Sequence, residues 1–321
     1  MPYNKFRPDR LNLLADVAEM YYLKGEDQSQ ISKKLNVTRS MVSRMLSEAR
    51  KLNMVKVHIE RPVNRNGELE RELCQLFDLK KAIVVERASD QALLTSLGQA
   101  AARYIEEVLQ PGQILGTSWG TAISSTVDQM EIERPIPGIR IVQLLGSLGV
   151  RIKPYHGISI VHRLEDKLGG VGVYLNAPFL VENSQLASVL KESRDIRETI
   201  QLGSQADVAL LGIGSAEPTV SPYVLAGYLP EKEMQEMCDA GIVGDVCGNF
   251  IDFFGNPISS QLQERTIGLS LEELKRIPLR IGVSGGPHKL RPIIGALRGK
   301  LVNVLVTNAN TAQGVINQTI S

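Results

Sequence analysis

Apolar positions near the start of the chain recur with the period of a helix. They begin after Asp9 and stop at Gly25, which predicts a first helix over this stretch. A second, short helix is expected after a capping Asp27, with Gln30 at the capping-box position. Asn36 is suited to the left-handed conformation that closes a helix. The pattern therefore predicts two helices that meet across a short connection.

A third helix is predicted from a capping Thr38 to about Leu52. Its spacing places five residues on a buried stripe: Met41, Val42, Met45, Leu46 and Ala49. Five polar residues fall on the other face: Arg39, Ser40, Ser43, Arg44 and Ser47. Two helices joined by a three-residue turn have the spacing of a helix-turn-helix. The alternating segment "VKVHIE", which starts at Val55, predicts a wing strand after the third helix.

The pattern changes beyond Gly67, where strand-like apolar runs alternate with stretches of helical period such as "ALLTSLGQAAARYIEEVL". The predicted strands are "AIVV", "QILG", "IRIVQLL", "VGVYL", "DVALLGIG", "VCGNFI", "RIGVSG" and "VNVLVT". Near-continuous apolar strands between helices predict an α/β fold with a parallel sheet covered on both faces. We therefore expect a winged helix-turn-helix head at residues 1–61, a linker at 62–67 and one large α/β domain at 68–321.

The charge of the chain is divided between its two parts. The whole chain has 36 Lys and Arg against 35 Asp and Glu, a net charge of +1. Residues 1–62 have 12 basic and 7 acidic side chains, a net of +5, so the remaining residues, with 24 and 28, have a net of −4. A basic end on a slightly acidic body indicates that a polyanion is bound at one end only.

The polar face of the third predicted helix has the groups that a DNA major groove requires. Arginines can bind guanine O6 and N7, and small hydroxyls allow close approach to phosphates. Lys33 and Lys34 are placed to meet the DNA backbone, and we also expect Gln28, Gln30 and Thr38 at this interface. A merely solvated face is the alternative. The turn, the helix lengths and the following strand favour DNA, and a helix without aromatic residues disfavours RNA.

Small and polar residues follow the predicted strands of the large domain. These segments are "GTSWGT" (116–121), "GSLG" (146–149), "NAP" (176–178), "GIGS" (212–215), "SGGPHK" (284–289) and "TNANT" (307–311). Glycines let the backbone approach a ligand, and amides at a helix N-terminus attract anions. Open parallel sheets bind ligands at the carboxyl ends of their strands. We therefore predict a polar ligand pocket there, with "GTSWGT" as its best anion cradle.

Several other classes of function lack their sequence signals. No run of 18 apolar residues and no apolar leader are present, so we expect a cytoplasmic protein without a transmembrane helix. Neither a G-x-G-x-x-G motif with a downstream acid nor a P-loop motif occurs, and no cofactor is predicted. The histidines lack metal-ligand spacing: His58, His156, His162 and His288. The cysteines form no C-x-x-C pair and are expected to be reduced core residues: Cys74, Cys238 and Cys247.

Segments in both parts of the chain together form a specific set. In the head it is "QSQISKKLNVTRSMVSRML". In the body it is "GTSWGTAI", "IRIVQLLGSLG", "DVALLGIGS", "AGIVGDVCGNFID", "LRIGVSGG" with the following Lys289, and "LVNVLVTN". In this order they resemble the SorC/DeoR-type sugar-binding transcriptional regulators over nearly the whole chain. The resemblance implies a body with the fold of glucosamine-6-phosphate deaminases, ribose-5-phosphate isomerases and CoA transferases, which binds a sugar phosphate without converting it.

The resemblance also assigns roles to individual residues. Lys289 would hold the phosphate together with the "GTSWGT" loop: Gly116, Thr117, Ser118, Trp119, Gly120 and Thr121. Asp245 would accept hydrogen bonds from sugar hydroxyls. The remaining pocket would be lined by Gln143, Asn176, Gly212 and Gly214. For Trp119 three roles stay open at this point: stacking on a sugar ring, narrowing the pocket, or packing in the core.

The leading prediction is a homo-oligomeric regulator of a carbohydrate catabolic operon whose hold on operator DNA changes when a sugar or sugar phosphate binds. The alternative is a sugar-phosphate isomerase or deaminase that carries a DNA-binding head. Such chemistry needs a positioned acid and base. Asp245 could be one of them, but no second carboxylate or histidine comes with a motif, so no enzyme is predicted. Phosphorylation of the effector, repression or activation, and dimer or tetramer stay open.

Overall fold

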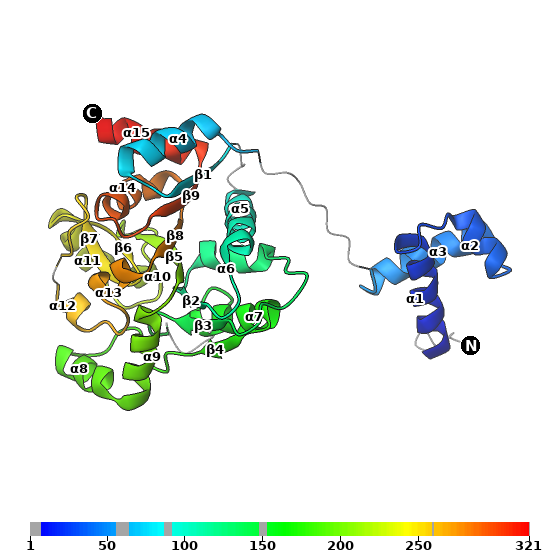
Figure 1. Ribbon diagram of the computed structural model, residues 1–321, viewed down its shortest axis with the longest axis horizontal. Coiled ribbons are helices and arrows are strands. Elements are labelled where there is room, and N and C mark those ends of the chain that lie inside the picture. The colour runs from blue at the N-terminus through cyan, green and yellow to red at the C-terminus, as the bar shows by residue number, and fades with distance from the viewer. Residues whose placement is uncertain (1–7, 56–63, 87–91, 148–152, 259, 321) are drawn as a thin grey trace. The chain divides into compact units, whose positions relative to one another are not determined.

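The computed structural model describes residues 8–55, 64–86, 92–147, 153–258 and 260–320. The chain divides into two compact units, residues 1–62 and 63–321. Each unit has its own hydrophobic core, so they are described separately, as the head and the body (Figure 1).

The head contains three helices in its described part: α1 (Pro8–Tyr22), α2 (Gln28–Lys34) and α3 (Arg39–Lys51). Asp27 caps α2 by accepting hydrogen bonds from two amides of the first turn, and the Gln30 side chain accepts one from the Asp27 amide. The Thr38 hydroxyl caps α3. Asn36 has a φ angle of +50° between the two helices. The caps and the turn that the sequence predicts are therefore confirmed.

Buried apolar side chains hold the three helices together: Leu14, Val17, Ala18, Ile31, Val42, Leu46 and Ala49. Met41 is not among them, because 41% of its surface is exposed, and its prediction as a buried residue is wrong. The buried stripe of α3 advances by four and three residues, from Val42 through Leu46 to Ala49, and Met41 lies about 100° away from it. Met45 is half-buried. The predicted wing strand lies outside the described residues except for Val55.

The body is built on seven parallel strands in the order β1-β9-β8-β5-β2-β3-β4. Their bounds are β1 (Lys81–Val85), β2 (Ile114–Thr117), β3 (Arg140–Gln143), β4 (Val171–Val173), β5 (Val208–Ser215), β8 (Leu279–Val283) and β9 (Val304–Asn308). The predicted parallel sheet is confirmed. From β2 the chain proceeds outward through β3 and β4, and from β5 it proceeds the other way through β8 and β9. This reversal is a topological switch point, where a crevice opens at the carboxyl ends of the strands.

One predicted strand is wrong. The sequence predicts "VCGNFI" as a single strand of the parallel sheet, whereas Cys247 and Gly248 form the turn of a hairpin between β6 (Ile242–Val246) and β7 (Asn249–Asp252). Both turn residues have positive φ angles, +52° and +76°. Residues 242–251 are all buried, so the hydrophobic pattern alone does not reveal the turn. β6 pairs antiparallel with the end of β5, which extends the sheet beyond the carboxyl end of that strand.

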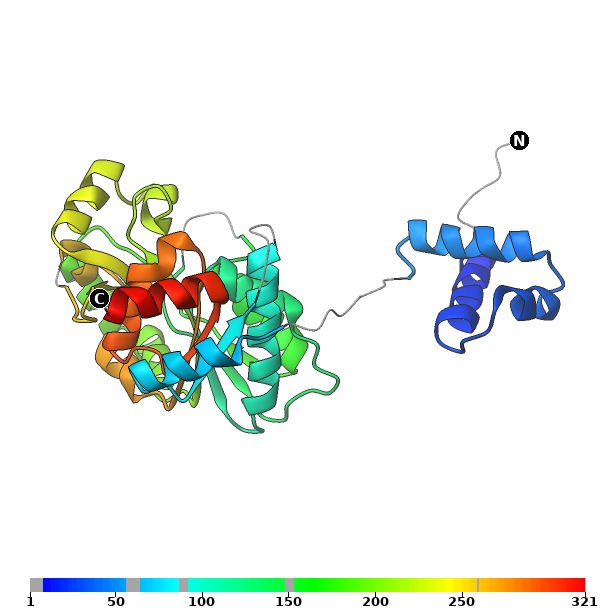
Figure 2. The ribbon, with the colours of Figure 1, turned by 90° about the horizontal axis from the view of Figure 1, so that it is seen from above.

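Helices cover both faces of the sheet (Figures 1 and 2). One face packs against α5 (Leu93–Val108), α6 (Thr121–Gln129) and α7 (Gly157–Leu168). The other face packs against α4 (Gly67–Phe77), α9 (Arg194–Ser204), α13 (Leu271–Arg276), α14 (Leu290–Arg298) and α15 (Ala309–Ile320). The shorter elements are α8 (Ser184–Glu192), α10 (Pro222–Leu225), α11 (Glu231–Asp239), α12 (Gln261–Glu264) and the 3-10 turn η2 (Pro287–Lys289).

The beginning and the end of the body lie side by side, because α4 packs along α15 (Figures 1 and 2). Residues 64–66, which precede α4, contact the rest of the body. The Asn66 amide donates to the Val84 carbonyl at 2.8 Å, and the Arg65 guanidinium pairs with Glu70 at 2.7 Å. The second half of the segment expected to be a linker is therefore held against the sheet.

Candidate functional site

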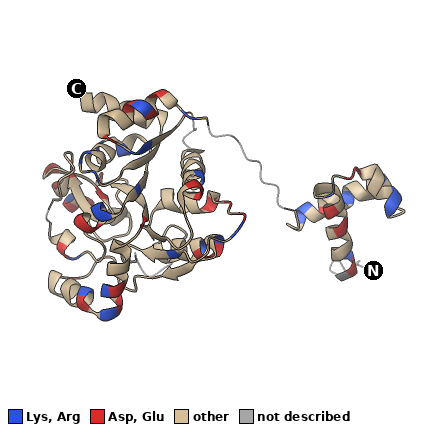
Figure 3. Ribbon diagram, in the orientation of Figure 1, with Lys and Arg blue, Asp and Glu red and all other residues tan. Residues whose placement is uncertain are grey.

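The outer face of α3 is polar and accessible. All five residues predicted for it are exposed: Arg39, Ser40, Ser43, Arg44 and Ser47. The Arg44 guanidinium donates to the Ser40 hydroxyl at 3.0 Å, so these two side chains lie on one surface. Figure 3 shows basic segments on both α2 and α3. The helix thus presents guanidinium and hydroxyl groups outward, as a helix that enters a DNA groove does.

The acidic residue of α3, Glu48, is held away from that face. It accepts a hydrogen bond from the Arg10 guanidinium of α1 at 2.7 Å. On α2, Lys34 pairs with Glu26 at 2.7 Å, whereas Lys33 is exposed without an ion pair among the described residues. The other predicted contacts of the head differ in availability: Thr38 is exposed, Gln28 is half-buried, and the side chain of Gln30 is engaged in its capping box.

In the body, the end of β2 lies against β5 at the switch point. The Ser118 hydroxyl accepts a hydrogen bond from the Gly212 amide at 3.0 Å. Thr117 is buried beside it, and Thr121 is exposed as the first residue of α6. Gly120, with a φ angle of +138°, precedes α6, and no side chain caps this helix. The first-turn amides of α6 therefore point to where an anion can bind.

A carboxylate and an ammonium group meet at the end of β5. Asp245 of β6 pairs with Gly214 of β5 and is 7% exposed. A Cβ atom at position 214 would lie 1.9 Å from Asp245 Oδ1, so glycine leaves the room that the carboxylate occupies. Lys289 approaches from η2, and its Nζ donates to the Ile213 carbonyl at 2.8 Å. These three predicted residues are thus brought together by the fold.

Burial acts on both charges of this pair. Burial raises the pKa of Asp245, which the positive charge of Lys289 and a hydrogen bond from the Gly248 amide oppose. Burial lowers the pKa of Lys289, and the negative charge of Asp245 opposes that change. The two groups make no direct ion pair within the described structure. Lys289 therefore keeps donors, and Asp245 an acceptor, for a ligand.

The loops that follow β5, β8 and β9 are tied together. The Gly286 amide donates to the Thr311 hydroxyl at 2.8 Å, and this hydroxyl donates to the Asn308 side chain at 2.7 Å. His288 Nδ1 contacts the Glu217 carboxylate at 2.6 Å, and this hydrogen bond lowers the pKa of Glu217. The segment that carries Lys289 is therefore held by α15 through Thr311 and by the loop after β5 through Glu217.

Three predicted residues make no hydrogen bond to Gly214, Asp245 or Lys289 among the described residues. Gly116 lies within β2 and not in the loop after it, because the strand continues to Thr117. Gln143 is buried, and its Nε2 donates to the Leu145 carbonyl at 2.8 Å. Asn176 is exposed in the segment after β4. Their roles as ligand contacts remain predictions.

Trp119 is packed among aromatic side chains. It is half-buried, and its ring meets that of Phe179 edge-on, with 5.4 Å between the centroids. Its Nε1 is buried without a hydrogen-bond partner in the described part of the chain. Of the three roles left open by the sequence, the structure shows packing in the core. The indole N–H can still donate a hydrogen bond to a ligand.

Tyr223 and Phe179 belong to the same region, although no motif in the sequence marks either of them. The Phe179 ring lies between Trp119 and Tyr223, with 5.6 Å between its centroid and that of Tyr223. Burial raises the pKa of Tyr223, and the nearby Asp245 carboxylate adds to the effect. Tyr223 comes from the four-residue helix α10, which has no motif, so only the fold places it beside Asp245.

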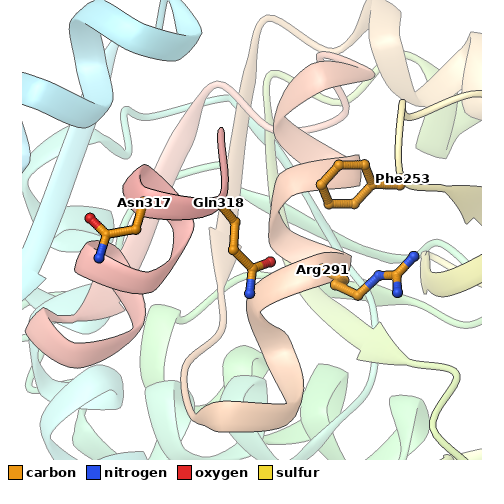
Figure 4. A pocket seen from close by; sticks show the side chains of 4 residues that line it. All are labelled: Phe253, Arg291, Asn317 and Gln318. Atoms are coloured by element: carbon orange, nitrogen blue, oxygen red, sulfur yellow. The ribbon is translucent and has the colours of Figure 1, made fainter. Parts of the chain in front are cut away.

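Two surface cavities have linings that do not include this group. The first, of about 510 Å³, is lined by Phe253, Arg291, Asn317 and Gln318 (Figure 4). The second, of about 300 Å³, is lined by Lys191, Arg197, Ile200, Asn249, Gln263, Thr266, Gly268, Leu269, Ser270 and Glu273. Neither contains a predicted effector residue. The carboxyl edge is the better candidate, because it places a buried carboxylate beside a lysine at the switch point.

Two further possibilities, a metal site and a membrane-spanning helix, have no support in the described residues. These residues hold no group of three His, Cys, Asp or Glu side chains that could bind a metal ion. None of their helices has the length and hydropathy needed to cross a bilayer.

Comparisons with known proteins agree with this arrangement. The sugar-binding domain family (Sugar-bind) matches residues 61–317. The chain is 30% identical over 311 residues to the deoxyribonucleoside regulator of Bacillus subtilis (strain 168), which covers 96% of this chain and 98% of that protein. It is 32% identical over 306 residues to the transcriptional regulator LsrR of Enterobacter sp. (strain 638), which covers 95% of this chain and 92% of that protein.

A solved structure is similar over the same length. The crystal structure of the full-length sorbitol operon regulator SorC from Klebsiella pneumoniae has a TM-score of 0.73 and 28% sequence identity to this chain. The match covers 96% of this chain and 99% of that one. The likeness therefore includes both the head and the body.

Proposed function

Because the chain belongs to the SorC family of sugar-binding transcriptional regulators, we propose that its body binds a sugar phosphate at the carboxyl edge of the sheet and that its head binds operator DNA. The protein is a sugar-responsive transcriptional regulator. Its relatives are named for different compounds, sorbitol and deoxyribonucleosides. We therefore define the effector by class, as a sugar or polyol, and we infer its phosphate from Lys289 and the uncapped start of α6.

One observation carries the effector half of this proposal: Asp245 and Lys289 approach each other, largely buried, beside Gly214 at the end of β5. Lys289 and the amides at the start of α6 supply positive charge for a phosphate. The Asp245 carboxylate accepts hydrogen bonds from hydroxyl groups. Ser118, Gly120 and Thr121 complete the phosphate end, and the proposed remaining lining is Thr117, Trp119, Gln143, Asn176 and Gly212.

The proposed division of labour follows the two compact units. Residues 1–61 bind DNA, and residues 68–321 bind the effector and join the subunits into a homo-oligomer. An effector can change DNA binding only if it has different affinities for the two states of the protein. A regulator of transcription works where the operator is, so we infer a cytoplasmic location.

We further infer that the body binds its sugar phosphate without converting it. Isomerases and deaminases need an acid and a base around the reacting carbon. The described groups that act on the charge of Asp245 are Lys289, Tyr223 and the Gly248 amide, and they include no second carboxylate and no histidine.

One experiment tests both halves of the proposal. Sugar phosphates are added to the protein bound to DNA selected from a random-sequence pool, and DNA release and sugar-phosphate consumption are followed together. Release without consumption is expected, and turnover would favour the enzyme.

Replacing Arg44 with alanine should weaken binding to the selected DNA by about 1–3 kcal/mol and relax the preference at one base pair, because a guanidinium that reads a base is lost. Lys33→Ala should weaken binding to all DNA sequences about equally and lower the salt slope by roughly 1. Fluorescence anisotropy over a salt series measures both effects. Arg50→Ala, at the far end of α3, is the matched control. An Arg39→Ala, Arg44→Ala double variant with unchanged affinity would refute the recognition-helix assignment.

A fragment of residues 63–321 should stay oligomeric and bind the effector without binding DNA. One helix-turn-helix reads only a few base pairs, so specific binding needs at least two heads on one assembly. The head is too small to hold such an assembly firmly, and the body has its own core. Sedimentation at micromolar concentration, with and without sugar phosphate, measures the state. A fragment that is monomeric under both conditions would contradict the assignment of the subunit contacts to the body.

A further inference from the structure

Buried polar atoms without hydrogen-bond partners gather at the carboxyl edge of the sheet. In the described part of the chain they include Trp119 Nε1, Gln143 Oε1, the Tyr223 hydroxyl and Thr307 Oγ1. These residues lie after β2, at the end of β3, after β5 and near the end of β9. A buried polar atom without a partner lowers stability, and most native proteins avoid it. Trp119 and Gln143 belong to the proposed lining of the effector site, and Tyr223 lies beside Asp245, so a ligand bound there would supply partners to their polar atoms.

The Tyr223 ring is fixed in place by other rings. It is 1% exposed, and its centroid lies 4.9 Å from that of Phe250 and 5.6 Å from that of Phe179. Phe179 in turn contacts Trp119. A ring packed on two sides cannot swing its hydroxyl away to reach water. The hydroxyl therefore keeps its direction whether or not a ligand is present.

The Asp245 carboxylate is the charged group that acts most strongly on the Tyr223 hydroxyl. The Asp245 carboxylate adds to the burial that raises the pKa of Tyr223, which keeps the phenol protonated and able to donate. One oxygen of Asp245 accepts a hydrogen bond from the Gly248 amide at 3.1 Å. The other oxygen faces Gly214, where a side chain is absent. The two side chains interact, and this contact contributes to the pKa changes of both, but the Tyr223 hydroxyl makes no hydrogen bond of normal geometry to any described residue.

We propose that the Tyr223 hydroxyl and the Asp245 carboxylate bind one hydroxyl group of the effector between them. The ligand hydroxyl donates to Asp245 and accepts from Tyr223, so all three groups are satisfied at once. Tyr223 is then a specificity-determining residue that selects sugars or polyols with a hydroxyl at this position over their deoxy analogues. This inference rests on the proposed function, because it requires the effector to lie at the carboxyl edge.

The substitution Tyr223→Phe tests the role of the hydroxyl alone, because phenylalanine keeps the ring between Phe179 and Phe250. The effector affinity should fall about threefold to tenfold, the value of one hydrogen bond. The melting temperature of the unliganded variant should stay the same or rise, because a buried group without a partner is removed. A hydroxyl with a structural role would give the opposite change in melting temperature.

A matched control is Tyr174→Phe. The Tyr174 hydroxyl donates to the Glu165 carboxylate of α7, so it has a partner within the protein. This variant should lose thermal stability and keep its effector affinity. The two tyrosines thus have opposite expected effects on stability and on binding.

The experiment uses calorimetry on the full chain with ribose 5-phosphate, glucose 6-phosphate and glucitol 6-phosphate, and with the monodeoxy analogues of the tightest binder. With one analogue, Tyr223→Phe should cause no further loss, because the hydroxyl that Tyr223 binds is already missing. Suppose that the wild type binds a sugar phosphate. The role of Tyr223 is then refuted, and the proposed function stands, if the Kd of Tyr223→Phe is within about twofold of the wild-type value. The same conclusion follows if the melting temperature of Tyr223→Phe is lower than that of the wild type. If the wild type binds no sugar phosphate, both fail.

Discussion

Lys289→Ala should weaken the binding of a phosphorylated effector by about 2–5 kcal/mol, which is well over tenfold in Kd. The lysine is largely buried, and burial lowers its pKa while the Asp245 carboxylate opposes that change. Among the described residues, its Nζ donates one hydrogen bond, to the Ile213 carbonyl at 2.8 Å. A dianionic phosphate placed here would gain a charge-assisted hydrogen bond that water does not replace. Isothermal calorimetry with the phosphate and with its unphosphorylated parent measures the loss.

The unphosphorylated parent separates the two anchors of the site. Lys289→Ala should largely spare it, because it has no charge for the lysine to bind. Asp245→Ala should weaken both compounds, because their hydroxyls lose the acceptor. Lys232→Ala removes a lysine of α11 whose side chain is 90% exposed and which belongs to no proposed contact, so both affinities should stay unchanged. Wild-type affinities in both site variants would mean that the effector binds elsewhere.

Local rules explain how much of the head could be predicted. A helix cap involves residues within three positions of one another, so Asp27, Gln30 and Thr38 can be identified from spacing alone. Met41 shows the limit of such rules. Whether a residue at the margin of a helical stripe is buried depends on the helices packed against it, and α1 and α2 cover Val42 and Leu46 but not Met41.

In the body, the sequence predicts the sheet better than it predicts the site. Near-continuous apolar runs identify the parallel strands, but the order of the strands, and with it the switch point between β2 and β5, comes from the structure. The hairpin at Cys247 and Gly248 is missed because the buried run continues from β6 through the turn into β7. Tyr223 is missed because its place beside Asp245 depends on α10 and β6 meeting in space. Asp245 and Lys289 were expected at the site only through their motifs, and the fold supplies the physical reason.

Gly214→Ala should disturb the site without removing any of its functional groups. The new methyl would lie 1.9 Å from Asp245 Oδ1 and 2.9 Å from its Cγ, far closer than atoms can approach. Asp245 is buried and must move, and overpacking of this kind costs about 1–3 kcal/mol. For a unit of this size that corresponds to a fall in melting temperature of about 2–12 °C. The displaced carboxylate should also weaken effector binding at least as much as Asp245→Ala does.

Gly212→Ala is the matched control, two residues earlier on the same strand. A methyl group there would have the Trp119 carbonyl as its nearest neighbour, at 3.6 Å, an ordinary contact distance. Its melting temperature should therefore stay close to that of the wild type. Differential scanning calorimetry of both unliganded variants measures the contrast. If Gly214→Ala has the melting temperature of the wild type, Asp245 has room to move at no cost. In that case β5 does not hold the Asp245 carboxylate in place, although the proposed effector recognition requires a fixed carboxylate.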